Sequence, residues 1–125
     1  MVENTDENTT VDQIKKEVRR FSQERDWLKY HNPKDLAISI SIESAELLEH
    51  FQWLKDGEIE RVLSNPADFN EMKSEIADVI NYAFALSNRL GIDISKTLLE
   101  KIKDNEKKYP INKVKGEYKK YKEIV

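Results

Sequence analysis

The chain has 125 residues, of which 38% are hydrophobic and 36% are charged, and its formal net charge is −3. This length corresponds to one domain, the charge gives no basic field of the kind that binds a nucleic-acid backbone, and the lack of cysteine excludes disulfides and thiolate chemistry. Because no apolar run approaches the roughly 20 residues of a membrane span and the N-terminus has no signal-peptide core, we expect a soluble, cytoplasmic protein that binds neither nucleic acid nor membranes.

The N-terminal part of the chain is predicted as a tail followed by a helix. Residues 1–9 are polar and acidic, and we expect them to be disordered. Thr10 and Gln13 have the spacing of a capping box. Apolar residues at steps of three, four and seven then predict an amphipathic helix over 11–28.

A second helix is predicted over about 34–54. Asn32 is its expected N-cap, and Pro33 its expected first residue. Residues 37–42 alternate with a period of two and are rich in isoleucine, which is typical of a strand. A helical stripe that passes through this segment without a turn favours the helix. The stripe consists of Leu36, Ile40, Leu47, Phe51 and Leu54.

The longest helix is predicted over 67–90, after a short helical turn at 58–63. Gly91 is expected to end it in a left-handed cap. A fourth helix follows and extends to about residue 108, before a proline ends it.

Four helices with short connections predict an all-α fold, a four-helix bundle. Its domain spans residues 10–110, and residues 111–125 form a Lys- and Tyr-rich C-terminal tail without a clear period. Because a small chain buries little surface on its own, we expect oligomerisation to complete the core.

Two of the predicted helices carry acidic pairs at a spacing of three residues, Glu43 with Glu46 and Glu75 with Asp78. Such pairs project from one side of a helix, although some arise by chance among 24 acidic residues in 125 positions. These two pairs lie on or beside the apolar stripes, where carboxylates seldom remain unpaired. If both stripes face one core, four carboxylates meet between adjacent helices.

Four converging carboxylates need a counterion. Two unit charges about 4 Å apart repel by about 4 kcal/mol at an effective dielectric constant of 20, and no Lys or Arg lies on the stripes to neutralise them. All-oxygen ligands suit Mg²⁺ or Mn²⁺ rather than zinc, and magnesium accepts phosphate oxygens as further ligands, which indicates phosphoryl chemistry. One alternative is that the acids are ordinary solvated carboxylates. A di-iron bundle is disfavoured, because neither His31 nor His50 completes the Glu-x-x-His motif that it needs.

The acidic pairs belong to a longer string of motifs over roughly residues 21–110. In chain order the motifs are Arg25-Asp26-Trp27, Tyr30-His31-x-Pro33-x-x-Leu36, Glu43-x-x-Glu46-Leu47-x-Glu49-x-Phe51-Gln52-Trp53, Glu75-x-x-Asp78-Val79-x-x-Tyr82 and Lys101-x-x-x-Asn105-x-x-x-Tyr109-Pro110. The string resembles the dCTP pyrophosphatase branch of the MazG-like nucleotide pyrophosphohydrolase superfamily. The acidic motifs alone are short, whereas the Phe-Gln-Trp and Lys-Asn-Tyr-Pro blocks are specific.

The resemblance implies a helical bundle of the MazG-like type that forms a dimer, or a tetramer built from dimers, with active sites close to the subunit contacts. Members cleave nucleoside triphosphates between the α- and β-phosphates with Mg²⁺, releasing the monophosphate and pyrophosphate. Carried over by position, the catalytic and metal-binding residues are Glu43, Glu46, Glu75 and Asp78. One of these acids would activate the nucleophile for in-line attack.

The resemblance also implies a set of substrate-binding residues. Trp27, Trp53 and Tyr82 match base-recognition aromatics, His31 a substrate contact, and Lys101 with Asn105 a pair that reaches phosphate oxygens. Each has an alternative interpretation, which is core packing for the aromatics, capping of the second helix for His31, and an ordinary surface position for Lys101.

The predicted function is hydrolysis of dCTP or a modified pyrimidine deoxynucleotide, in cleaning of the nucleotide pool. The sequence departs from the vertebrate dCTP enzymes at Ile42 and Ser44-Ala45, which replace small, Gly-containing neighbours of the acidic motif, and at Tyr30, where Phe is common. Two alternatives stay open. The same fold acts on dUTP or purine triphosphates, or the chain is a non-catalytic helical module that binds a nucleotide or a protein.

Overall fold

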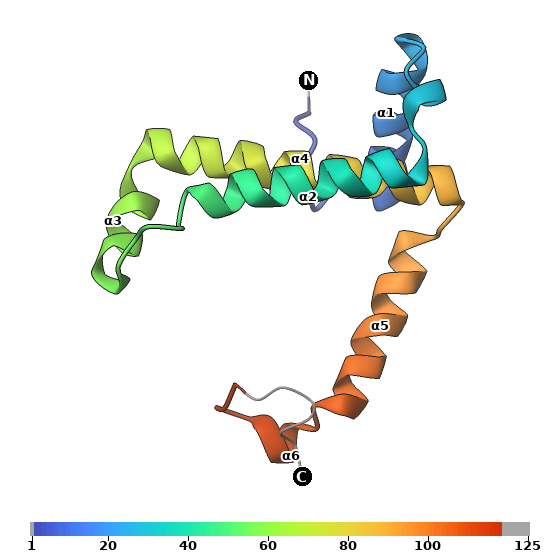
Figure 1. Ribbon diagram of the computed structural model, residues 1–125. Helices are drawn as coiled ribbons and strands as arrows, with labels where there is room; N and C mark the ends of the chain where they lie inside the picture. The colour runs from blue at the N-terminus through green and yellow to red at the C-terminus, as the bar shows by residue number, and fades with distance from the viewer. Residues whose placement is uncertain (1, 119–125) are drawn as a thin grey trace. The chain divides into compact units, whose positions relative to one another are not determined.

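The computed structural model describes residues 2–118, and this part of the chain is helical and contains no strand (Figure 1). Its elements are α1 (Val11–Glu24), η1 (Leu28–Tyr30), α2 (Pro33–Glu49), η2 (Asp56–Glu58), α3 (Ile59–Ser64), α4 (Pro66–Leu90), α5 (Ile94–Lys108) and α6 (Ile111–Val114), where η marks a 3₁₀ turn. The predicted all-α fold class is confirmed. None of the described helices combines the length and the apolarity that crossing a membrane requires.

Side-chain caps determine where the helices begin and end. The Thr10 hydroxyl accepts a hydrogen bond from the Gln13 N–H at 3.1 Å, and the Gln13 side chain accepts one from the Thr10 N–H at 2.7 Å, so the predicted capping box is confirmed. Asn32 caps α2 by accepting from the Asp35 N–H at 2.9 Å. At the end of α4, Gly91 adopts the predicted left-handed conformation, with a φ of 66°.

Two helix ends predicted from periodicity are wrong. The first helix stops at Glu24 because Asp26 has a positive φ of 55°, which a right-handed helix does not allow. The second helix stops at Glu49, and a series of turns follows it. Trp53 therefore lies on a turn, and not on the helical face of Glu46, where a longer helix would have placed it.

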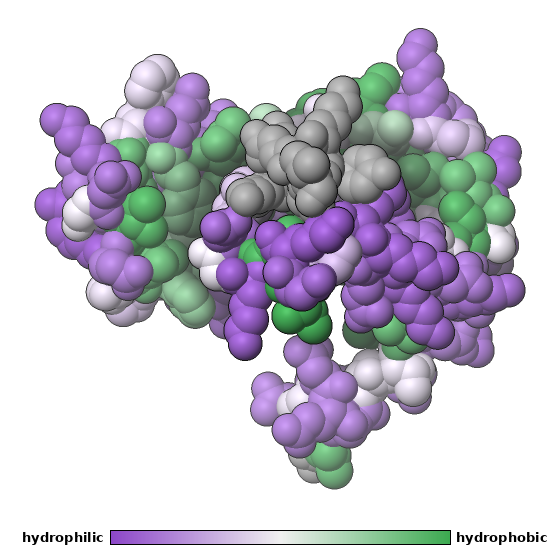
Figure 2. All heavy atoms as spheres, turned by 90° about the horizontal axis from the view of Figure 1, so that it is seen from below, coloured by the Kyte–Doolittle hydropathy of each residue, from purple (hydrophilic) through white to green (hydrophobic). Residues whose placement is uncertain are grey.

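The chain divides into two compact units, residues 1–92 and 93–125. In the first unit α2 and α4 lie antiparallel and side by side (Figure 1). The buried apolar residues are Leu36 of α2 and Met72 and Ala85 of α4. This core is small, and apolar atoms reach the surface between hydrophilic ones on the face shown in Figure 2.

Helix α1 packs against the C-terminal half of α4 within the same unit. Lys15 of α1 holds the two helices together through both its side chain and its backbone. Its ammonium donates to the Ile92 carbonyl at 2.7 Å, and its own carbonyl accepts from Asn88 Nδ2 at 2.9 Å. These bonds fix the end of α4 beside the N-terminal half of α1.

The predicted terminal segments are described in part. Asn8 Oδ1 accepts a hydrogen bond from the Thr5 N–H at 2.7 Å, and disorder of residues 1–9 stays a prediction. The predicted tail over 111–125 begins with α6, and its residues 119–125 lie outside the described part of the chain.

Candidate active site

The predicted acidic pairs converge between α2 and α4. Glu43 of α2 and Glu75 and Asp78 of α4 each place one carboxylate oxygen within 4.8 Å of the others. The helices pack through the stripes that carry these acids, as the helical periodicity predicted. Glu46 lies outside this group of three, but its carboxyl interacts with both Glu43 and Glu75. We call the four residues the acidic cluster.

Individual carboxylate oxygens in the acidic cluster are fully buried. Oε2 of Glu43 and Oε2 of Glu75 have no hydrogen-bond partner within residues 2–118. A buried polar atom without a partner costs free energy, so each oxygen has a lone pair that a cation would satisfy. This observation, together with the all-oxygen donor set, fits a divalent ion of the Mg²⁺ or Mn²⁺ type.

Crowding changes the acid–base properties of the cluster. The pKa of Glu43 is raised to about 7, first by hydrogen bonding with the Glu46 carboxyl, then by burial, and then by repulsion from the surrounding carboxylates. The pKa of Glu75 is also raised, first by burial, then by hydrogen bonding with Glu46 and by repulsion from Glu46 and Asp78. Without a cation, burial and neighbouring carboxyls therefore raise the pKa of both Glu43 and Glu75 above the ordinary value of glutamate.

His50 is a residue of this site that the sequence-based prediction missed. Its imidazole Nε2 lies 4.0 Å from Oε1 of Glu75, and its side chain is only 17% exposed. His50 follows Glu43 by seven residues, a spacing that returns to the same helical face. A search of that face for titratable groups would have identified it, whereas a search for Glu-x-x-His did not.

The predicted base-recognition aromatics have three different environments. Tyr82 is half-buried on α4, one turn after Asp78. Trp53 is 83% exposed on the turn after α2. Trp27 packs edge-on against Phe21, with 5.7 Å between the ring centroids. Of the three, Tyr82 is on the same helix and within one turn of the acidic cluster.

The remaining predicted substrate residues belong to other elements of the chain. His31 follows η1 and lines a cavity together with residues of α1 and α4. Lys101 and Asn105 are exposed on α5, which belongs to the second unit. Their roles in substrate binding stay predictions.

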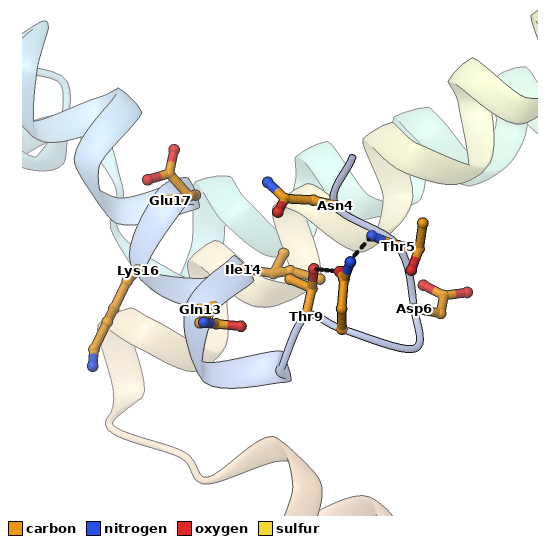
Figure 3. A pocket seen from close by; sticks show the side chains of 9 residues that line it. Asn4, Thr5, Asp6, Thr9, Gln13, Ile14, Lys16 and Glu17 are labelled. Atoms are coloured by element: carbon orange, nitrogen blue, oxygen red, sulfur yellow. Dashed lines mark hydrogen bonds between the residues drawn. The ribbon is translucent and has the colours of Figure 1, made fainter. Parts of the chain in front are cut away.

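A hollow of about 580 Å³ lies between the N-terminal segment and α1 (Figure 3). Asn8 Oδ1 closes one side by accepting hydrogen bonds of 2.7 and 2.8 Å from neighbouring residues. Two of its charged groups are already paired, Lys16 with Asp12 at 2.7 Å and Glu17 with Arg20 at 2.7 Å. None of the predicted site residues lines it, so it is not the candidate active site.

The model of the MazG-like family matches residues 38–124 of this chain. Human dCTP pyrophosphatase 1 is 32% identical over 115 residues, which cover 92% of this chain and 68% of the human protein. The rat protein of the same name is 30% identical over the same shares of both chains. A crystal structure of a pyrophosphatase from Archaeoglobus fulgidus is similar over 88% of this chain and 99% of that chain, with a TM-score of 0.75 and 39% identity.

The all-helical fold, the acidic cluster and the similarity to pyrophosphatases define the chain as an enzyme of the nucleotide pyrophosphohydrolase class. The chain belongs to the MazG-like family. The predicted resemblance to its dCTP pyrophosphatase branch is confirmed.

Proposed function

We propose that this enzyme is a Mg²⁺-dependent nucleoside triphosphate pyrophosphohydrolase that releases the monophosphate and pyrophosphate. The observation that carries the proposal is the convergence of Glu43, Glu75 and Asp78, whose ligand atoms lie within 4.8 Å of one another. The buried oxygens of Glu43 and Glu75 that lack partners among the described residues support a cation at this position.

The four residues of the acidic cluster have two different roles in the proposed reaction. Glu43, Glu75 and Asp78 would hold the ion, which supplies neutralisation of phosphate charge when it is bound. Glu46 stands outside that group of three yet beside two of its members. We assign to Glu46 the role of proton acceptor from the attacking water, because it is the carboxylate least committed to the ion.

The proposed substrate is dCTP or a modified pyrimidine deoxynucleotide, with nucleotide-pool cleaning as the role. Support comes from relatives named dCTP pyrophosphatase 1 at 30% to 32% identity. The exposed ring of Trp53 and the ring of Tyr82 offer surfaces on which a base stacks, an interaction of about 1–3 kcal/mol per base. The alternative substrates are dUTP and purine triphosphates.

The deciding experiment incubates the purified chain with Mg²⁺ and a panel of deoxynucleotide and ribonucleotide triphosphates, and separates the products by chromatography. We expect monophosphate and pyrophosphate in equal amounts. Release of orthophosphate without pyrophosphate would place the cleaved bond elsewhere. Relative kcat/KM across the panel identifies the base, and a lack of turnover with every nucleotide would contradict the proposed activity.

We also propose that the enzyme is a homo-oligomer, either a dimer or a tetramer. Four isoleucines of the first unit are between 45% and 52% exposed, namely Ile38 and Ile42 of α2 and Ile76 and Ile80 of α4. Isoleucine is among the residues most often buried in folded proteins. We therefore infer that a second copy of the chain packs against these four side chains. The cytoplasmic location stays a prediction.

A further inference from the structure

A second polar site lies between α1 and α4. It is a cavity of about 170 Å³ whose polar lining consists of Arg19, Ser22, His31, Asn88 and Arg89. This volume corresponds to that of about six water molecules and is below the roughly 300–1,000 Å³ of pockets that enclose drug-sized ligands. The cavity therefore suits a ligand of a few heavy atoms and not a whole nucleotide.

The lining of the cavity is positively charged. Arg19 of α1 and Arg89 of α4 both contribute to it, no Asp or Glu is among the residues that line it, and neither guanidinium forms an ion pair within residues 2–118. Arg20, next to Arg19, is by contrast paired with Glu17 and Glu24. Two unpaired guanidiniums from different helices provide the fork-shaped donor sets that bind oxoanions.

Ser22 adds a buried polar group to the wall of the cavity. The residue is only 6% exposed overall, and it lines the cavity. A serine hydroxyl at this wall can donate a hydrogen bond to an anion or to water in the cavity. Asn88 is held in place by its bond to the Lys15 carbonyl at 2.9 Å, and His31 contributes an imidazole.

We propose that this cavity binds a phosphate-class oxoanion, either inorganic phosphate or pyrophosphate. Guanidiniums from two helices line the cavity, and a guanidinium binds phosphate oxygens through two parallel hydrogen bonds. The site is separate from the acidic cluster, because Arg89 follows Asp78 by eleven residues on α4, about 16 Å along the helix axis. The inference goes beyond the proposed function and does not depend on it.

The test is calorimetric titration of the full chain with inorganic phosphate and with pyrophosphate, in buffer with a chelator. Without a divalent ion the acidic cluster repels anions, so binding reports on the cavity. We expect the Kd for phosphate to increase at least about 10-fold in Arg19→Gln and Arg89→Gln. Arg61→Gln, which removes the same charge from an exposed position on α3, should bind as the wild type does. Because both cavity arginines are exposed, the variants should keep the wild-type Tm.

A second measurement uses the two histidines of the chain. In proton NMR spectra, phosphate should shift the ring signals of His31, which lines the cavity, and not those of His50. Wild-type protein that binds neither anion, or arginine variants that bind both unchanged, would overturn the proposal. An increased KM for nucleotide in Arg89→Gln would show that the cavity binds the substrate itself and would overturn a separate anion site, whereas an unchanged KM would support it.

Discussion

The imidazole Nε2 of His50 lies 4.0 Å from Oε1 of Glu75, at the point where α2 ends beside α4. The pKa of Glu75 is raised first by burial, then by hydrogen bonding with Glu46 and by repulsion from Glu46 and Asp78. His50 acts in the opposite direction and lowers that pKa, because its positive charge favours the carboxylate. In the absence of a divalent ion, His50 therefore offsets part of the rise in the pKa of Glu75 that the neighbouring carboxyls cause.

Replacing His50 with Gln should destabilise the metal-free protein, because Glu75 loses the neighbouring imidazole that lowers its pKa and favours its carboxylate. We expect the Tm to decrease by roughly 1–4 °C, the size of a partly exposed ion pair in a chain of this length. Thermal unfolding in a chelating buffer measures the change. His31→Gln is the matched control, and an equal loss in both variants would mean that the contact of His50 with Glu75 contributes nothing of its own.

Replacing Glu75 with Gln should separate stability from activity. The variant loses a metal ligand, so kcat/KM should decrease by at least about 100-fold. It also loses one of the crowded charges, so the metal-free Tm should increase, as expected where function requires a strained site. Glu71→Gln, an exposed acid one turn earlier on α4, should leave both quantities unchanged. Undiminished turnover of Glu75→Gln would remove Glu75 from the catalytic set.

The stability of the metal-free enzyme should depend on pH through Glu43. Its pKa is about 7 in the folded protein and 4.5 ordinarily, so the folded state binds the proton more tightly than the unfolded chain does. This contribution is fully present below pH 4.5 and is lost as the pH rises from 4.5 through 7. The Tm in chelator should therefore decrease over this window, and less steeply in Glu43→Gln.

Magnesium should restore the stability that the metal-free enzyme loses as the pH rises. Above pH 7 the carboxylates are charged and can bind the ion. A free ion concentration of 100 times the Kd stabilises the fold by about 2.7 kcal/mol. For a chain of this length, that is roughly 10 °C in Tm. Differential scanning calorimetry at pH 8 with and without Mg²⁺ measures the shift, and calcium and manganese give the ion preference. A Tm that does not respond to any divalent ion would contradict the metal site.

Local chemistry was sufficient to predict most of the backbone and the acidic cluster. Asn32 and Gly91 act through hydrogen bonds and dihedral angles that involve only their neighbours, and periodicity placed Glu43 and Glu75 on stripes that pack together. The end of α2 was missed because the apolar stripe continues to Leu54 while the backbone turns. Periodicity reports which side a residue faces, and it does not report where the helix stops.

The cavity between α1 and α4 could not be predicted from the sequence. Arg19 and Arg89 are far apart in the chain, and each is an unremarkable surface position on its own helix. They share a cavity only because Lys15 and Asn88 hold α1 against the end of α4. Such a site depends on tertiary packing, for which no single helix carries a signal.

Trp53 should contribute to substrate binding and not to stability. Its side chain is 83% exposed, so Trp53→Ala removes little buried surface and should leave the Tm within about 2 °C. If the ring stacks on the base, KM should increase by at least about 5-fold, the lower limit of one base–aromatic contact. Trp27→Ala is the informative comparison, because Trp27 packs on Phe21 and should lower the Tm. An unchanged KM in Trp53→Ala would mean that the Trp53 ring does not contact the base.

The exposed isoleucine face of α2 should determine the oligomeric state. Ile38 and Ile42 are one turn apart, and Ile42 is 52% exposed. A glutamate at position 42 would put a charge into a subunit interface that excludes water, where an unpaired charge is costly. Light scattering coupled to size exclusion should then show Ile42→Glu shifting toward the monomer mass of 14.7 kDa, while Asn70→Glu on the exposed surface of α4 keeps the wild-type mass. If the wild-type chain itself is a monomer, the isoleucines are covered by something other than a second copy.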